Sequence, residues 1–570
     1  MNNSATSESS AASRWPSQIK YIVGNEACER FSYYGMRSIL AGYITGAVVG
    51  GGLGQTTDRA TEIIHLFVFA NYFMPLFGAW LSDKIIGRYH TILWVSLFYC
   101  AGHGVLACSD LAGDVHGKMI CLATGLGLIA FGSGGIKPCV SAFMGDQFRP
   151  EQSHLLQKAY GAFYWAINFG SFFSFLVIPW IKDHRGYSWA FAVPGILMAI
   201  ATFVFWLGTK YYTRIPTNRQ LHHAGFFTVF WHAFRSGPEF RFSAALNIVA
   251  TIGLPVLAVG LMTILGFSDR TGSSAQILGW TALVCIGIWY VLVLGLSVLR
   301  KTELPAAFWQ KAAGRHGEKE ITGARSFTPI LFIFAFVPIF WTLFDQTSST
   351  WVLQGLQMNP VTVFGYNIGA EEMQSMNPLI VMILVPLFTL GLYPRIGRFA
   401  SPLKRMSCGM FVAAFAYVVV AFIQSRVDGY WHGVAVQYAA VTAALPADGP
   451  LGPPHLHLAP PPCVLWQTAP YIILTAAEVL FSTTGLEFAF REAAPELKST
   501  IMSFWLLTVS MGDLFVVTVT KLFASATNEA ASVSPGRFLQ YAGMTLVVAL
   551  LFSVVAAFYQ YRDPLAAEGK

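Results

Sequence analysis

Four charged residues interrupt the first long apolar run of this 570-residue chain: Glu26, Glu29, Arg30 and Arg37. Positions 26, 30, 33 and 37 follow the helical spacing i, i+4, i+7 and i+11, so they share one face, and Glu29 lies on its flank. Charges at the centre of a membrane span cost roughly 2.5–3.5 kcal/mol each and are functional by default. Two carboxylates beside an arginine can gain and lose a proton, as a proton-coupled carrier requires. The alternative is a structural ion cluster that pins the helix to its neighbours.

Other polar side chains also lie within apolar runs. His65 is near the outer end of the second run, where it could titrate or could be a packing histidine with satisfied hydrogen bonds. Trp341 and Trp505 lie inside their runs and could line a pocket or face lipid. Asn168 and Asn377 could bind a ligand or bridge two helices. The residue types alone leave both roles open in each case.

A lysine in the fourth run follows four small residues. Lys137 comes directly after Gly132-Ser133-Gly134-Gly135, and such glycines let another helix approach closely. A lysine buried there needs an acidic partner. The acids within later apolar runs that could be this partner of Lys137 are Asp345, Glu478 and Glu487. Glu487 lies near the inner end of its run and could face water, so Glu478 is the predicted partner.

The composition indicates what surrounds these runs. The chain is 55% hydrophobic and 11% charged, with a mean hydropathy of +0.54, whereas a soluble domain carries about 25% charged residues. Lipid must therefore cover much of its surface. A span needs about 20 apolar residues, and the segments that qualify are 18–45, 62–83, 90–109, 118–143, 159–182, 188–212, 242–266, 275–299, 327–352, 375–394, 405–424, 467–490, 500–524 and 538–561.

Basic residues gather in alternate gaps between the spans, which predicts an inside N-terminus. The net charge of +7 follows this topology and does not indicate nucleic-acid binding. The spans divide into six, two and six. We expect an N-terminal six-helix bundle over 1–212 with a short disordered tail, basic linkers and an extra helix pair over 213–326, and a C-terminal six-helix bundle over 327–570. The Pro-rich stretch 446–462 is predicted to be an extended outside loop.

Five segments resemble motifs of the proton-dependent oligopeptide transporter family of the major facilitator superfamily. The first, EACERFSYYG at 26–35, matches the family motif ExxERFxYYG at each fixed position. The other four are 78–88, 134–138, 163–171 and 340–346, and all five occur in the family's order. The resemblance covers nearly the whole chain.

This resemblance implies an all-α polytopic membrane protein with the major facilitator fold. Twelve core helices would form two bundles, and the extra pair, typical of bacterial members, would bring the spans to fourteen. The resemblance assigns proton coupling to Glu26, Glu29, Arg30, His65 and Glu478. It assigns the substrate pocket to Tyr33, Arg37, Tyr72, Lys137, Asn168, Trp341, Asn377, Glu478, Ser482 and Trp505. Arg37 and Asp345 would also form an outer gate, and Lys137 would pair with Glu478 in the empty carrier.

The implied function is proton-coupled import of di- and tripeptides by alternating access. Arg37 and Lys137 would hold the peptide carboxylate, and Glu478 would hold the α-amino group. The resemblance implies a carrier and not an enzyme, driven by the proton gradient with no cofactor and no metal. Its partners would be peptides, protons and lipid, with no nucleic acid, and the family default is a monomer. It would lie in a bacterial cell membrane, the inner one in a Gram-negative host, with both termini cytoplasmic. The position of His65, ten residues before Pro75, resembles animal members.

Three other functions compete with peptide import. A carrier of nitrate, amino acids or another small solute could use the same fold. A membrane enzyme would need a metal or nucleophile set, which His222, His223, His455 and His457 do not form by their spacing. A ligand-gated channel would need a continuous polar pore, whereas these charges gather in a few helices.

Overall fold

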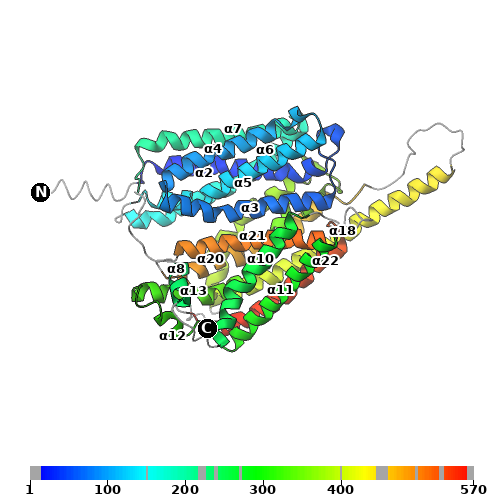
Figure 1. Cartoon of the computed structure of the whole chain (residues 1–570). Coiled ribbons are helices and arrows are strands. Elements are labelled where there is room, and N and C mark those ends of the chain that lie inside the picture. Colours follow the sequence, from blue (N-terminus) through cyan, green and yellow to red (C-terminus); the bar gives the residue numbers. More distant parts are fainter. Residues whose placement is uncertain are drawn as a thin grey trace.

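The computed structural model describes residues 15–148, 152–215, 226–235, 242–268, 272–397, 401–444, 460–494, 498–524 and 532–561. Its long helices run roughly parallel and form two bundles that lie side by side (Figure 1). The first 14 residues of the predicted N-terminal tail lie outside the described residues, as does 446–459 of the predicted Pro-rich loop. Both predictions therefore stay predictions.

The N-terminal bundle contains six long helices. Two of them begin at side chains that accept a free backbone N–H of the first turn: Thr56 accepts from Arg59 at 3.2 Å, and Asp114 accepts from Gly117 at 2.9 Å. Such caps satisfy backbone N–H groups that have no partner within the helix, and they thereby fix the residue at which each helix begins. The six helices are α2 (Ile19–Thr45), α3 (Thr57–Lys84), α4 (Gly87–Ala107), α5 (Val115–Gly145), α6 (Ser153–Arg185) and α7 (Tyr187–Leu207).

The segment between the bundles carries the extra helix pair. This pair packs against two helices of the C-terminal bundle, α21 (Lys498–Leu522) and α22 (Pro535–Phe558). The ammonium of Lys521 donates to three carbonyls at the end of α10, those of Leu265 (2.9 Å), Gly266 (2.9 Å) and Ser268 (2.8 Å). The pair is thus fixed to the second half. The first span of the pair consists of α9 (Phe242–Ile248) and α10 (Leu254–Gly266), and the second is α11 (Ser273–Val298). Two shorter helices, α8 (Phe226–Arg235) and α12 (Ala306–Gln310), precede and follow the pair in the chain.

The C-terminal bundle has more broken helices than the first. Its opening span consists of α13 (Glu318–Phe334), α14 (Val337–Phe344) and α15 (Thr350–Gly355), with a 46° bend after Phe334. Pro338, which lacks an N–H, stands at the start of α14 and favours the break. The remaining helices, besides α21 and α22, are α16 (Met376–Pro386), α17 (Tyr393–Ile396), α18 (Pro402–Ala444), α19 (Thr468–Glu478) and α20 (Thr484–Glu492).

Two boundaries differ from the prediction. The expected start of the C-terminal bundle at 327 falls inside α13, which begins at Glu318. The prediction began too late because the first turn of α13 is charged and adds nothing to the hydropathy. The predicted span 405–424 covers only the first half of α18, which continues to Ala444 past the polar residues Ser425, Arg426 and Asp428. Hydropathy locates the part of a helix inside lipid and misses its extension into water.

The bundles have two ends. We call the end with loop 46–56 and a two-stranded hairpin the hairpin face, and the opposite end, with 208–215 and 299–317, the linker face. The hairpin consists of antiparallel strands β1 (Val361–Val363) and β2 (Tyr366–Ile368), and Val361 pairs with Ile368. Gly365, at φ 80°, makes the turn in a left-handed conformation that suits glycine.

Membrane-spanning helices dominate the described residues. Twelve of them are long and apolar enough to cross a membrane, or thirteen if the bent helix pair counts as one span. The helix α2 has 27 residues but carries Glu26, Glu29, Arg30 and Arg37. It packs against α6 and α7, and with α2 the fourteen predicted spans are accounted for.

Candidate functional site

The charged residues of α2 form a buried cluster within the N-terminal bundle. The Nε of Arg30 lies 2.8 Å from Oε1 of Glu26 and 2.7 Å from Oε2 of Glu29. The hydroxyl of Ser133 on α5 donates to Oε1 of Glu29 at 3.1 Å. The three charged side chains are at most 11% exposed. With two carboxylates and one guanidinium, the cluster has room for one more proton.

Lys137 lies close to this cluster because of the small residues that precede it. A Cβ on Gly134 would come within 2.5 Å of the carbonyl oxygen of Asn71, so glycine allows α5 to touch α3 as predicted. The ammonium of Lys137 then lies 4.6 Å from the ring centre of Tyr33 and 4.0 Å from that of Tyr72. These contacts place the cation against two aromatic faces.

Glu478 faces the N-terminal bundle from α19. Asn377 of α16 donates to its Oε2 at 2.7 Å and to the hydroxyl of Thr475 at 3.3 Å. A π-helical segment, Val479–Thr483, follows Glu478 directly and contains the partly exposed Ser482. Such π-bulges are frequent at functional sites.

The predicted pair between Lys137 and Glu478 is not formed in this structure. The Nζ of Lys137 is buried and makes no hydrogen bond among the described residues. The acidic groups that interact with it include Glu29 and Asp345, and also Glu26 and Asp513. The reason is geometric: Glu478 is held by Asn377 in its own bundle, while Asp345 is brought to the N-terminal bundle by Arg37.

The predicted outer gate joins the two bundles. Nη2 of Arg37 lies 2.8 Å from Oδ1 of Asp345, and both side chains are less than a tenth exposed. His65 forms a second link: its Nδ1 lies 2.6 Å from Oδ1 of Asp513 on α21, and its Nε2 lies 2.9 Å from the hydroxyl of Ser349. His65 is therefore a partner of polar groups on the other bundle and not a packing residue.

The hairpin face carries further links between the bundles. The ammonium of Lys182 on α6 lies 2.7 Å from Oε2 of Glu371. The hydroxyl of Tyr366 donates to the carbonyl of Leu176 at 2.5 Å. The amide of Gln374 donates to the carbonyl of Ser38 at 3.1 Å. Together with the gate, these contacts close the molecule toward the hairpin face.

The remaining predicted site residues lie on helices around this region. The rings of Trp341 and Trp505 meet edge to face, with centroids 6.3 Å apart, and both are buried. Burial of both rings favours a position in the protein interior over contact with lipid. The amide of Asn168 donates to the carbonyl of Tyr164, one turn back on its own helix, at 2.9 Å. In this structure Asn168 therefore satisfies the backbone of α6.

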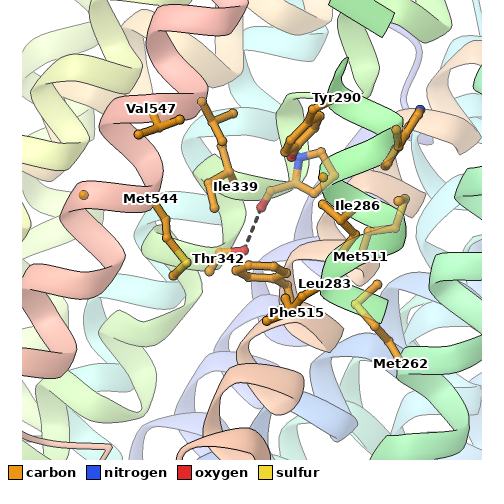
Figure 2. A pocket seen from close by; sticks show the side chains of 15 residues that line it. Met262, Leu283, Ile286, Tyr290, Ile339, Thr342, Met511, Phe515, Met544 and Val547 are labelled. Carbon is orange, nitrogen blue, oxygen red and sulfur yellow. Dashed lines mark hydrogen bonds between the residues drawn. The ribbon is translucent and has the colours of Figure 1, made fainter. Parts of the chain in front are cut away.

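A separate cavity of about 590 Å³ lies between the extra helix pair and the C-terminal bundle. Figure 2 shows that its walls are apolar side chains such as Met262, Ile286, Met511 and Val547. Of its two labelled hydroxyl groups, those of Tyr290 and Thr342, the hydroxyl of Thr342 already donates to the carbonyls of Pro338 on its own helix and of Gly512. None of the predicted site residues lines it, so this cavity is separate from the predicted site.

Sequence reasoning missed three residues that link the bundles. Asp513 is an acid inside the apolar run 500–524, and the rule that identified Asp345 and Glu478 would have found it. Ser349 and Glu371 gave no such signal, because a serine is common in spans and Glu371 lies in a loop.

Comparison with known proteins decides the family. The model of the POT family matches residues 89–535 of this chain. The chain belongs to the POT family. Its sequence is 32% identical to solute carrier family 15 member 2 of Rattus norvegicus over 432 residues, which is 74% of this chain and 50% of that protein. Peptide transporter family 1 of Drosophila melanogaster is 24% identical over 727 residues, 96% of this chain and 88% of that protein.

Solved POT structures share the whole fold. A POT family peptide transporter crystallised in an auto-inhibited form is 37% identical, with a TM-score of 0.76 over 96% of this chain and 98% of that one. The POT family transporter PepTSo is 36% identical, with a TM-score of 0.76 over 96% and 99%. The chain spans about half the length of the rat and human curated relatives. Membership of this family confirms the resemblance and the fold, and it excludes the membrane enzyme.

Proposed function

We propose that this POT family member is a proton-coupled symporter that imports di- and tripeptides by alternating access. The observation that carries the proposal is the placement of opposite charges on facing bundles. Arg37 and Lys137 belong to the N-terminal bundle, whereas Glu478 belongs to the C-terminal one. Tyr34 and Tyr164 of the N-terminal bundle are close enough to act electrostatically on Glu478, so this carboxylate faces the cations' bundle.

A zwitterionic peptide suits such a pocket. Its carboxylate end would bind the Arg37 and Lys137 side, and its α-amino end would bind Glu478 through charge-assisted hydrogen bonds. The ends of a short peptide lie at a backbone-determined distance, so recognition of both ends is independent of the side chains. The aromatic walls of Tyr33, Tyr72 and Trp341 would tolerate different side chains.

Transport would follow from breaking and making the links between the bundles. Arg37–Asp345 and His65–Asp513 hold the hairpin face closed. Opening that face requires both pairs to separate, and rigid bundles can then rock about the central site. Proton binding at Glu26, Glu29, His65 or Glu478 would bias this motion, with Arg30 as the fixed positive charge beside the two glutamates in the predicted coupling set.

The same proposal covers location and assembly. The protein would be a monomer in the cell membrane, the inner membrane in a Gram-negative host, with both termini cytoplasmic and the hairpin face outside. The proton gradient would drive it without a cofactor. The basic linkers, which carry Lys210, Arg214, Arg300 and Lys301, lie at the linker face, as this orientation requires.

The direct test is uptake of labelled dialanine into proteoliposomes under an inward proton gradient, with and without an uncoupler. We expect accumulation above equilibrium that collapses with the uncoupler. Nitrate and single amino acids serve as competing solutes. Peptide that neither accumulates nor competes would refute peptide import and leave the fold intact.

A paired substitution tests the pocket. Glu478→Gln removes the proposed ligand of the α-amino group, and we expect about a tenfold loss of dialanine affinity, as for one charge-assisted contact. The control is Glu487→Gln on α20, because Glu487 is partly exposed and pairs with Arg405 at 3.1 Å. Equal losses in both variants would contradict the assignment of Glu478.

A further inference from the structure

Asp513 of α21 and His65 of α3 form one buried unit at the boundary between the bundles. The two side chains are fully buried, and their Nδ1 and Oδ1 atoms lie 2.6 Å apart. The helices that carry them pack against each other, and Figure 1 shows them as the adjoining helices of the two bundles. The unit therefore exists only while α3 and α21 are in contact.

The hydrogen-bond contacts of His65 and Asp513 determine where the pair can take up a proton. The hydroxyl oxygen of Ser349 lies 2.9 Å from Nε2 of His65 and forms a hydrogen bond with it. The second carboxylate oxygen of Asp513, Oδ2, is buried and makes no hydrogen bond among the described residues. A neutral imidazole beside a carboxylate can accept one proton, and the resulting imidazolium would be paired on both nitrogens. The pair therefore offers a complete site for one proton.

The surrounding charges balance in the absence of that proton. The charged groups that act on Asp513 are Asp345, Arg37 of α2 and Lys137 of α5. With His65 neutral, two cations face two carboxylates. On α3, the acid closest to His65 in sequence is Glu62, which is paired with Arg59 at 3.1 Å, and α10 contributes no titratable group. A proton on the pair thus adds one positive charge to these four groups, of which Lys137 also faces Glu26 and Glu29 of the neighbouring cluster.

We propose that the coupling proton binds to the His65–Asp513 pair and not to His65 alone, so that Asp513 is a coupling residue of the transport cycle. This inference rests on the proposed symport. A proton taken from water at the hairpin face converts His65 to an imidazolium, which pairs with the Asp513 carboxylate across the two bundles. The loaded pair stabilises closure of the hairpin face, and release of the proton on the other side weakens it.

The test compares Asp513→Asn with a matched variant on the same helix. Ser510 also links α21 to α3, through its hydroxyl and the carbonyl of Phe69 at 3.1 Å, but it cannot bind a proton. Each protein is assayed in proteoliposomes for dialanine accumulation under a proton gradient and for dialanine counterflow without a gradient. Counterflow reports binding and alternating access only.

For Asp513→Asn we expect gradient-driven accumulation to fall at least about tenfold more than counterflow, and the pH profile of uptake to flatten. Ser510→Ala should retain both activities, and Asp513→Glu should recover part of the accumulation. Full accumulation with a wild-type pH profile in Asp513→Asn would overturn the proposal, and so would loss of counterflow together with accumulation. A wild-type protein that does not accumulate dialanine would instead refute the proposed symport.

Discussion

The buried charges of this POT family member differ in whether their partners lie in the same bundle. The cluster of Glu26, Glu29 and Arg30 is complete within the N-terminal bundle, where Ser133 adds a hydrogen bond. Arg37 lies on the same helix and face, yet its partner, Asp345, belongs to the other bundle. One α-helix thus carries a pair that can persist through a rigid-body motion and a pair that must break.

This difference separates two roles. Charges that stay paired in every conformation can stabilise a bundle and can hold a proton that moves together with that bundle. Charges that pair across the boundary set the equilibrium between conformations, because opening the hairpin face leaves both partners to water. The variants below test this division, beginning with the largest expected effect.

Arg30→Ala should have the largest effect on stability. It leaves Glu26 and Glu29 buried without their cation, and breaking such a buried pair destabilises a protein by about 3–5 kcal/mol. We expect a clearly lowered unfolding temperature of the detergent-purified protein and no gradient-driven uptake. The control is Arg325→Ala, because Arg325 and its partner Glu303 are both exposed by more than a third. Its effect should stay within about 1 kcal/mol.

An Arg30→Ala protein that unfolds at the wild-type temperature would contradict the description of this cluster as an internal stabiliser. Its carboxylates would then have to be protonated or hydrated at no net cost. Uptake measured across pH would separate these two cases.

Arg37→Ala should have little effect on the stability of either bundle and a large effect on conformation. Spin labels at Leu111 and Phe364 would report the hairpin face, because Leu111 is 86% exposed on one bundle and Phe364 fully exposed on the hairpin of the other. We expect the population with short label distances to fall about tenfold or more, as for loss of a buried pair worth about 1.4 kcal/mol or more.

The charge-reversed double variant, Arg37→Asp with Asp345→Arg, should restore part of the short distances. Glu26→Gln, which alters only the internal cluster, should leave the distances unchanged. Longer distances in Glu26→Gln than in Arg37→Ala would reverse the proposed division of roles.

The sequence predicted much of this arrangement. The helical spacing of residues 26, 30, 33 and 37 placed the charges on one face, and hydropathy located the spans, because both depend on local pattern alone. The glycines before Lys137 predicted a close helix contact, and the structure has it.

Partners across the boundary were harder to predict. The sequence contains several candidate acids for Lys137 and gives no distance between them and the lysine. It therefore predicts Glu478 as the partner, whereas in the structure Glu29 and Asp345 are among the acids that act on Lys137. The pairing depends on which face of the carrier is closed, and no local pattern encodes a conformational state. Asp513 was missed although its position in an apolar run is as unusual as that of Asp345.

Lys182→Ala should have a smaller effect than Arg37→Ala on the same labels. Lys182 links the bundles through Glu371, but its side chain is 20% exposed, so water weakens the pair. Such partly exposed pairs contribute about 0.2–1 kcal/mol, and we expect at most about a fivefold loss of the closed population. A loss as large as that of Arg37→Ala would show that closure depends on the whole hairpin face and not on the buried gate.

The pH dependence of this last link should be the smallest effect, and its sign follows from Glu371. Burial raises the pKa of the Glu371 carboxyl in the closed state, although Lys182 offsets part of the rise. In the open state the carboxyl meets water and has its ordinary pKa, so the closed state binds the proton more tightly. Closure is therefore favoured at acidic pH, and this contribution is lost as the pH rises through the raised pKa. Glu371→Gln should remove that component of the label distances' pH dependence. Any pH dependence that remains in this variant would belong to groups deeper in the boundary, of which His65 and Asp513 are the first to test.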